Sequence, residues 1–152
     1  MKRIMNNQNF NDLLDKINLA KNIGIVTHKI PDADAVGSAC GLAYTLKQMG
    51  KNVEVLFEKP LKAEFDIFNL DDIVAYQPTF NYDLLIATDS GDTLRFGIHE
   101  QLFLKHENTV NIDHHITNLG YANLNYVDAF RSSASEYVFH ILTELKIEVM
   151  HQ

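Results

Sequence analysis

Short, uninterrupted apolar runs alternate along this chain with amphipathic stretches. The apolar runs predict strands over residues 23–27, 52–57, 82–88 and 109–112. Apolar residues at helical spacing predict helices over residues 10–21, 34–49 and 132–146. Strands without polar alternation are buried on both faces, as in a parallel sheet whose crossover helices cover both sides. The sequence therefore predicts an α/β fold: a doubly wound, mainly parallel β-sheet with helices on both faces.

Two of the predicted helices have recognisable ends. Gly50 follows the helix over 34–49, at the position where a glycine commonly ends a helix. Ser133-Ala134-Ser135-Glu136 fits a capping box at the start of the last helix. The stretch over 61–80 has no clear period, and no element is assigned to it.

The length of 152 residues is that of one domain with a core large enough to need no cross-links. The single cysteine, Cys40, rules out an internal disulfide and agrees with a reducing compartment. Residues 1–7 lack the apolar core of a signal peptide, and no segment reaches the length of a membrane span. We therefore expect a cytoplasmic protein that has no membrane partner.

The formal net charge of −7 argues against a groove for long duplex nucleic acid, which needs a basic stripe. The same charge leaves short anionic substrates open, because bound metal ions can reverse the charge locally.

Three of the predicted strands run directly into residues suited to metal binding or catalysis. In chain order these junctions are Thr27-His28, Thr88-Asp89 and Ile112-Asp113-His114. The carboxyl ends of parallel strands meet at one edge of the sheet, and ligands bind beyond that edge. We therefore expect these side chains to be neighbours in space.

The first cluster joins a histidine to two carboxylates. His28 leaves a strand, Pro31 stiffens the turn, and Asp32 and Asp34 follow at the start of a helix. In an extended turn this spacing lets both carboxylates face one cavity and bind different cations. The alternative is local, because either aspartate could cap the helix. Gly37 is expected to serve close packing of this helix against a strand.

The second cluster begins with Asp89, which ends an apolar strand. A buried carboxylate is costly unless it is paired or bound to a metal. The alternative is an ordinary turn aspartate in a Ser-Gly loop. Asp92 is expected to be a turn or cap residue. Arg95 is either a phosphate contact or a member of a structural ion pair.

The third cluster is Asp113-His114-His115. A strand that ends in a carboxylate and two imidazoles has little structural purpose, although a solvated surface pair is the alternative. Imidazole and carboxylate together suit Mn²⁺, Fe²⁺, Co²⁺ or Zn²⁺. One histidine can ligate a metal while its neighbour contacts the substrate, and Asp113 can orient a ring.

Asp128 by itself is an ordinary loop aspartate, and the serines after it are expected to be helix caps. The remaining histidines have no partner pattern and are expected to be structural or exposed: His99, His106, His140 and His151.

Together these clusters resemble the DHH phosphoesterases. The family pattern has a His-x-x-x-Asp-x-Asp block, a strand-ending aspartate with a downstream arginine, the eponymous Asp-His-His, and a late aspartate before a Ser-rich helix start. The residues that match are His28, Asp32, Asp34, Asp89, Arg95, Asp113, His114, His115, Asp128 and Ser132 to Glu136. All four motifs occur in the family's order.

The resemblance implies two divalent cations, Mn²⁺ first, with Mg²⁺ or Co²⁺ as alternatives. By that resemblance His28 and Asp32 would hold one ion, Asp34, His114 and Asp128 the other, and Asp89 would bridge them. Such a pair of ions binds phosphate oxygens and activates a water molecule for attack.

The resemblance also implies roles in substrate binding and catalysis. His115 would contact the scissile phosphate, Asp113 would support the histidines, and Asp89 would belong to the catalytic set. Arg95 and Ser133 are the further expected substrate contacts. A homodimer is one expected assembly.

Within the family, the block from Pro31 to Ser38 is most similar to enzymes that degrade very short RNA and dephosphorylate adenosine 3′,5′-bisphosphate. Cyclic-dinucleotide phosphodiesterases share the site. Family II inorganic pyrophosphatases usually carry Asn-Pro-Asp-Thr-Asp, so Ile30 and Ala33 count against them. The expected partner is thus a small phosphorylated substrate, a short RNA or a nucleotide.

The length of the chain and the lack of a glycine motif bear on the alternatives to an enzyme of this family. Family members normally continue into a second substrate-binding domain, called DHHA1, so residues 1–152 are expected to be a DHH domain incomplete at its C-terminus. A non-catalytic nucleotide- or metal-binding module is therefore the alternative to an enzyme. A dinucleotide-binding redox module is disfavoured because no Gly-x-Gly-x-x-Gly follows the first strand.

Overall fold

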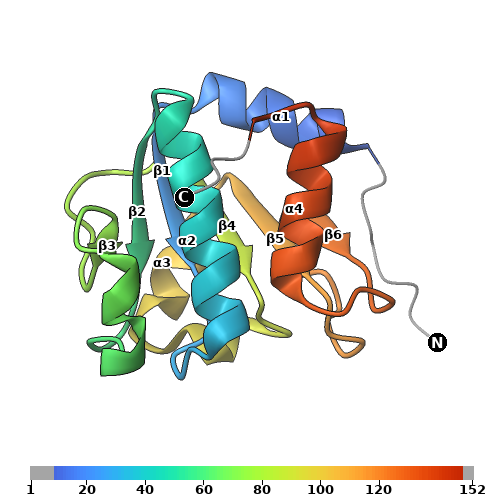
Figure 1. Ribbon diagram of the computed structural model, residues 1–152. Coiled ribbons are helices and arrows are strands. Elements are labelled where there is room, and N and C mark those ends of the chain that lie inside the picture. The colour runs from blue at the N-terminus through green and yellow to red at the C-terminus, as the bar shows by residue number, and fades with distance from the viewer. Residues whose placement is uncertain (1–8, 149–152) are drawn as a thin grey trace.

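The computed structural model describes residues 9–148 (Figure 1). Residues 1–7 and His151, on which expectations were stated above, lie outside the described residues. The elements are, in order, α1 (Phe10–Leu19), β1 (Asn22–Val26), α2 (Ala33–Gln48), β2 (Asn52–Leu56), η1 (Ala63–Phe68), β3 (Val74–Ala75), β4 (Leu84–Thr88), η2 (Thr93–His99), α3 (Glu100–Lys105), β5 (Thr109–Asp113), β6 (Leu124–Val127) and α4 (Ala134–Glu144). Here η denotes a 3₁₀ helix.

The strands form one six-stranded sheet in the order β3-β2-β1-β4-β5-β6. Every neighbouring pair is parallel. The chain builds outward from β1 to β3, then returns to place β4 beside β1 and builds outward to β6. The sheet is therefore doubly wound, as predicted, and its topological switch point lies between β1 and β4. In such sheets the crevice for ligands opens beyond the carboxyl ends at this point.

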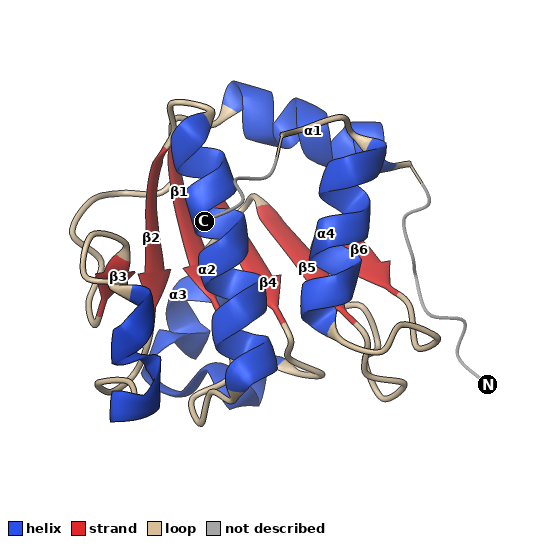
Figure 2. Ribbon diagram, viewed as in Figure 1, coloured by secondary structure: helices blue, strands red, loops and turns tan. Residues whose placement is uncertain are grey.

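Helices cover both faces of the sheet (Figure 2). The alternating side chains of β4 show how: Leu84 and Ile86 join the core beneath α1, α2 and α4. Leu85 and Ala87 join a smaller core on the other face, with aromatic residues of η2 and α3. Both faces of β4 are buried, which explains its unbroken apolar sequence.

The predicted elements are confirmed, and no predicted end differs from the observed one by more than two residues. Four of the elements that were not predicted are short: β3, η1, η2 and α3. The kink at Gly97 interrupts the helical period between residues 93 and 105. The strand β6 was also missed, because a buried asparagine, Asn125, breaks its apolar run.

The predicted helix ends are confirmed in part. Gly50 follows the C-cap of α2 with φ of +82°, a conformation that suits glycine. Ser133 is the N-cap of α4, and its Oγ accepts from the Glu136 amide at 3.0 Å. In a capping box the Glu136 carboxylate would also accept from the Ser133 amide. Here it accepts instead from the amide and hydroxyl of Ser132.

Within residues 9–148, no helix is both long and apolar enough to cross a membrane.

Candidate metal centre

Asp89 lies at the switch point, immediately after β4, and only 2% of its surface is exposed. Its φ of +52° is a left-handed conformation that aspartate tolerates better than most residues. Oδ2 lies 3.5 Å from His28 Nε2, and Oδ1 lies 3.5 Å from His114 Nε2. Each oxygen of this buried carboxylate therefore faces a different imidazole.

The first group of potential ligands is His28, Asp32 and Asp89, whose nitrogen and oxygen atoms lie within 4.8 Å of one another. Asp32 Oδ1 is 3.8 Å from His28 Nε2. The same oxygen accepts from the Ala35 amide at 3.0 Å, so Asp32 is also the N-cap of α2. Asp32 therefore caps α2 and at the same time lies in the first group of potential ligands.

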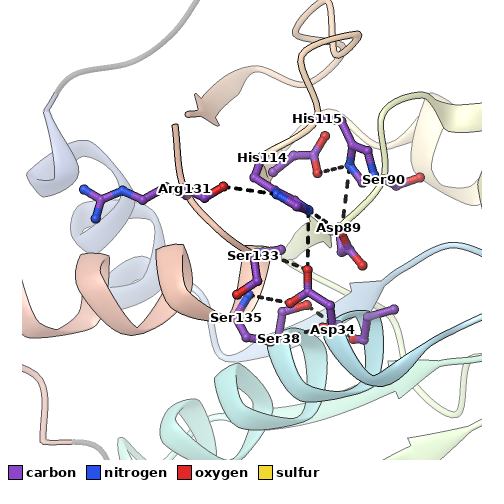
Figure 3. Close-up of polar contacts among 12 residues, drawn as sticks. Asp34, Ser38, Asp89, Ser90, His114, His115, Arg131, Ser133 and Ser135 are labelled. Atoms are coloured by element: carbon purple, nitrogen blue, oxygen red, sulfur yellow. Dashed lines mark hydrogen bonds and ion pairs between the residues drawn. The ribbon is translucent and has the colours of Figure 1, made fainter. Parts of the chain in front are cut away.

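The second group is Asp89, His114 and His115. His114 lies between two carboxylates, because Asp34 Oδ2 is also 3.5 Å from its Nε2 (Figure 3). Asp34 does not cap its own helix. Its two oxygens accept from the Ala134 and Ser135 amides at 2.8 Å, which places it at the start of α4.

Asp113 is fully buried and orients His115. Its Oδ1 lies 2.7 Å from His115 Nδ1. Its Oδ2 accepts from the side-chain amide of Asn118, also at 2.7 Å. Asn118 is itself fully buried, and its amide lies 3.1 Å from the Ser90 carbonyl. Asp113 thus contacts the His115 ring, and Asn118 in turn holds Asp113.

Sequence reasoning missed Asn118. In the sequence it is one more asparagine in a polar loop, and only its position five residues after Asp113 hints at a link. Gly37 serves close packing as expected, but between two helices: an added Cβ would lie 3.0 Å from Ser135 Oγ of α4.

The surroundings shift the pKa values of three site residues. A hydrogen bond with Asp89 raises the pKa of His28. Burial raises the pKa of Asp89. Burial also acts to raise the pKa of Asp34, but hydrogen bonds from Ser135 and Ala134 outweigh it and leave that pKa below its usual value.

Asp128 belongs to neither group of potential ligands among the described residues. Its Oδ2 accepts from Arg131 Nε at 3.1 Å, and its Oδ1 accepts from the Phe130 amide at 3.1 Å. Both oxygens are therefore engaged locally. The implied sharing of one ion with Asp34 and His114 is not supported by these positions.

The expected substrate contacts have structural partners of their own. Ser133 Oγ caps α4. Arg95 makes a loose ion pair with Asp92, 3.9 Å apart, and Asp92 caps η2 as expected. Arg95 and His28 line one hollow beside the first group. Of the other histidines, His99 is buried against the Phe57 carbonyl, which agrees with a structural role.

The donor set fits divalent transition metals. Imidazole nitrogens and carboxylate oxygens converge, and this mixture suits Mn²⁺, Co²⁺, Fe²⁺ or Zn²⁺. Asp89 carries the clearest sign, because a carboxylate this deeply buried needs a cation or a charged partner on each oxygen.

Comparisons with known proteins show the family of this chain. The profile of the DHH family, N-terminal domain, matches residues 22–152. The bifunctional oligoribonuclease and PAP phosphatase NrnA of Bacillus subtilis is 30% identical over 137 residues, covering 89% of this chain and 42% of the relative. The protein of the same name from Thermus thermophilus is 31% identical over 130 residues, covering 83% and 38%. The chain thus spans less than half the length of these curated relatives.

Two solved structures share the fold. An exopolyphosphatase-related protein from Bacteroides fragilis superposes with a TM-score of 0.82 at 23% identity, over 90% of this chain and 43% of that one. RecJ from Thermus thermophilus, solved in complex with Mn²⁺, superposes with a TM-score of 0.56 at 16% identity, over 98% and 23%. Since the family profile covers most of its length, the chain belongs to the DHH family and contains that family's N-terminal domain.

Proposed function

We propose that this domain is the catalytic part of a metal-dependent phosphoesterase that hydrolyses short oligonucleotides or nucleotide 3′-phosphates such as adenosine 3′,5′-bisphosphate. The position of Asp89 carries the proposal: one buried carboxylate, at the switch point of the sheet, is shared by two groups of potential ligands. The names of the Bacillus subtilis and Thermus thermophilus relatives support the substrate class.

In this proposal, His28, Asp32 and Asp89 hold one divalent cation, while Asp89, His114 and Asp34 hold a second. The ions are Mn²⁺ first, with Mg²⁺ or Co²⁺ as alternatives. When bound, two such ions polarise a phosphate and activate water for hydrolysis. His115 is left out of the ligand set because its Nδ1, the atom nearest Asp89, is engaged by Asp113.

The protein's own groups then position the substrate. The Asp113 carboxylate accepts a hydrogen bond from His115 Nδ1, which leaves Nε2 as the ring nitrogen that faces the scissile phosphate. The amides at the start of α4 orient Asp34 and lower its pKa, so this carboxylate stays ionised. Arg95 is the proposed further contact for phosphate, and Ser133 can donate its hydroxyl hydrogen while its oxygen caps α4.

Metal content and turnover test the proposal together. Metal analysis after loading with Mn²⁺ should give two ions per chain. Hydrolysis should be measured on adenosine 3′,5′-bisphosphate, a dinucleotide, a cyclic dinucleotide and pyrophosphate. The first two should be the preferred substrates, whereas preference for either of the others assigns the chain to a different activity of the same superfamily.

A non-catalytic role has its own signature: tight binding of Mn²⁺ with no hydrolysis of any of these compounds. Metal-independent redox activity with a nicotinamide cofactor would refute the proposal outright.

The expectations of a homodimer and of a second, substrate-binding domain stay predictions.

A further inference from the structure

A hollow of about 320 Å³ lies directly beside the first group of potential ligands. It is lined by His28, Lys29, Ile30 and Arg95. His28 belongs both to this hollow and to the first group, so a substrate held at the metal centre can extend into the hollow. We call it the Lys29–Arg95 hollow.

Two basic residues, Lys29 and Arg95, line the hollow, although the formal net charge of the chain is −7. Lys29 is exposed, and within residues 9–148 its ammonium has no ion pair. Among the described residues, Arg95 pairs only with Asp92, at 3.9 Å, and both side chains are more than half exposed, at 54% and 57%. Exposed pairs of this kind hold a guanidinium weakly, so both cations are free to meet an anion.

A backbone hydrogen bond holds residues Lys29 and Arg95 next to each other. The Lys29 amide donates to the Arg95 carbonyl at 2.7 Å, which joins the loop after β1 to the 3₁₀ helix after β4. Gly97 lets these segments approach: an added Cβ there would lie 3.3 Å from Lys29 Cβ. The hollow thus spans the switch point between β1 and β4.

We propose that the Lys29–Arg95 hollow binds a second phosphate of the substrate, one that is not hydrolysed. This inference rests on the proposed function, because the scissile phosphate is taken to sit at the metal centre. It narrows the substrate class to compounds with two phosphate groups on one nucleoside, or on adjacent nucleosides of a short strand. Lys29 is then a specificity-determining residue, since a monophosphate cannot reach both sites at once.

Binding of non-hydrolysable analogues tests the subsite without turnover. The first probe is adenosine with a 5′-phosphate and a 3′-methylenephosphonate, and the second lacks the 5′-phosphate. Calorimetry with the Mn²⁺-loaded chain should show the first binding at least about tenfold more tightly, the size expected of one charge-assisted contact. Lys29→Gln should remove most of this preference while leaving Mn²⁺ affinity and binding of the second probe unchanged. Arg95→Gln should also remove most of the preference.

Two variants serve as controls. Lys21→Gln makes the same change to an exposed lysine at the opposite end of β1, and it should keep the full preference. Lys29→Arg should also keep it, because the charge stays in place.

The outcomes separate the two hypotheses. If both probes bind equally to the unmodified chain, or if Lys21→Gln reduces the preference as much as Lys29→Gln does, the subsite is refuted and the metal centre is untouched. If the Mn²⁺-loaded chain binds neither probe, the proposed function fails, and the subsite fails with it.

Discussion

The side-chain amide of Asn118 donates a 2.7 Å hydrogen bond to the buried carboxylate of Asp113. The other oxygen of that carboxylate lies 2.7 Å from His115 Nδ1. Asn118 also reaches the carbonyl of Ser90, which follows Asp89. One buried amide therefore connects the Asp-His-His segment to the loop that carries the central aspartate.

Asn118→Ala should impair catalysis more than metal binding. The substitution leaves a buried Asp113 oxygen without its donor, which costs about 1–3 kcal/mol of stability. It also frees the His115 ring to rotate, so kcat should fall while two Mn²⁺ ions still bind. Denaturant unfolding, metal analysis and steady-state kinetics check this. Equal kcat values for the variant and the unmodified domain would show that Asn118 does not act through His115.

Asp89→Asn should abolish the metal centre, whereas Arg95→Ala should spare it. Asparagine tolerates the positive φ at this position, so the comparison isolates the lost charge from backbone strain. We expect metal-dependent hydrolysis to fall by at least about 10³-fold for Asp89→Asn, with loss of bound Mn²⁺. Arg95→Ala should retain both ions. Similar, mild effects of the two substitutions would contradict the shared-ligand site.

Asp128 and Asp34 offer a second paired test. The Asp128 carboxylate is engaged by Arg131 and the Phe130 amide, so Asp128→Asn should keep the metal stoichiometry. Asp34→Asn should lose one ion, because Asp34 lies against His114. Metal analysis after dialysis decides the point. Loss of an ion in Asp128→Asn would restore the ligand role that the family resemblance implies.

The metal-free domain should lose stability as the pH rises from about 5 to about 8. The folded-state pKa of His28 is raised by its hydrogen bond with Asp89, and that of Asp89 is raised by burial. The folded state therefore binds more protons than the unfolded state, and this advantage disappears as the pH climbs through the raised pKa values. Asp34, whose pKa is lowered, titrates below this window.

Urea midpoints measured in the presence of a chelator check this pH dependence. The His28→Asn variant, which lacks the titrating ring, should show a smaller decrease. A midpoint that rises across the same range would mean that the His28–Asp89 contact does not control it.

Gly97→Ala should destabilise the domain for two independent reasons. Gly97 has φ of +59° and ψ of −125°, a backbone conformation that costs an L-residue about 1–3 kcal/mol. An added Cβ would also collide with Glu58 Oε2. Removing the collision in Gly97→Ala/Glu58→Ala should therefore recover only part of the loss in unfolding free energy. Full recovery would show that the backbone conformation carries no cost.

The fold was predictable because strands of a two-sided sheet have unbroken apolar runs, such as residues 84–88. The residues at the strand ends were predictable because topology brings those ends together. The segment from 93 to 105 was not, since the Gly97 kink interrupts its period. Asn118 was not, since a buried asparagine and a loop asparagine have the same local sequence. The contact of Asp34 with the start of α4 was not predictable either, because the two segments lie far apart in the sequence.

That distance has a consequence for folding. Asp34 accepts from the amides of Ala134 and Ser135, 100 and 101 positions away. A helix of 11 residues such as α4 is marginal in water without tertiary partners. Its first turn is stabilised by a carboxylate that is in place only after α2 has docked on the sheet. We expect α4 to join late, so in an incompletely folded chain Asp34 is not yet held against His114.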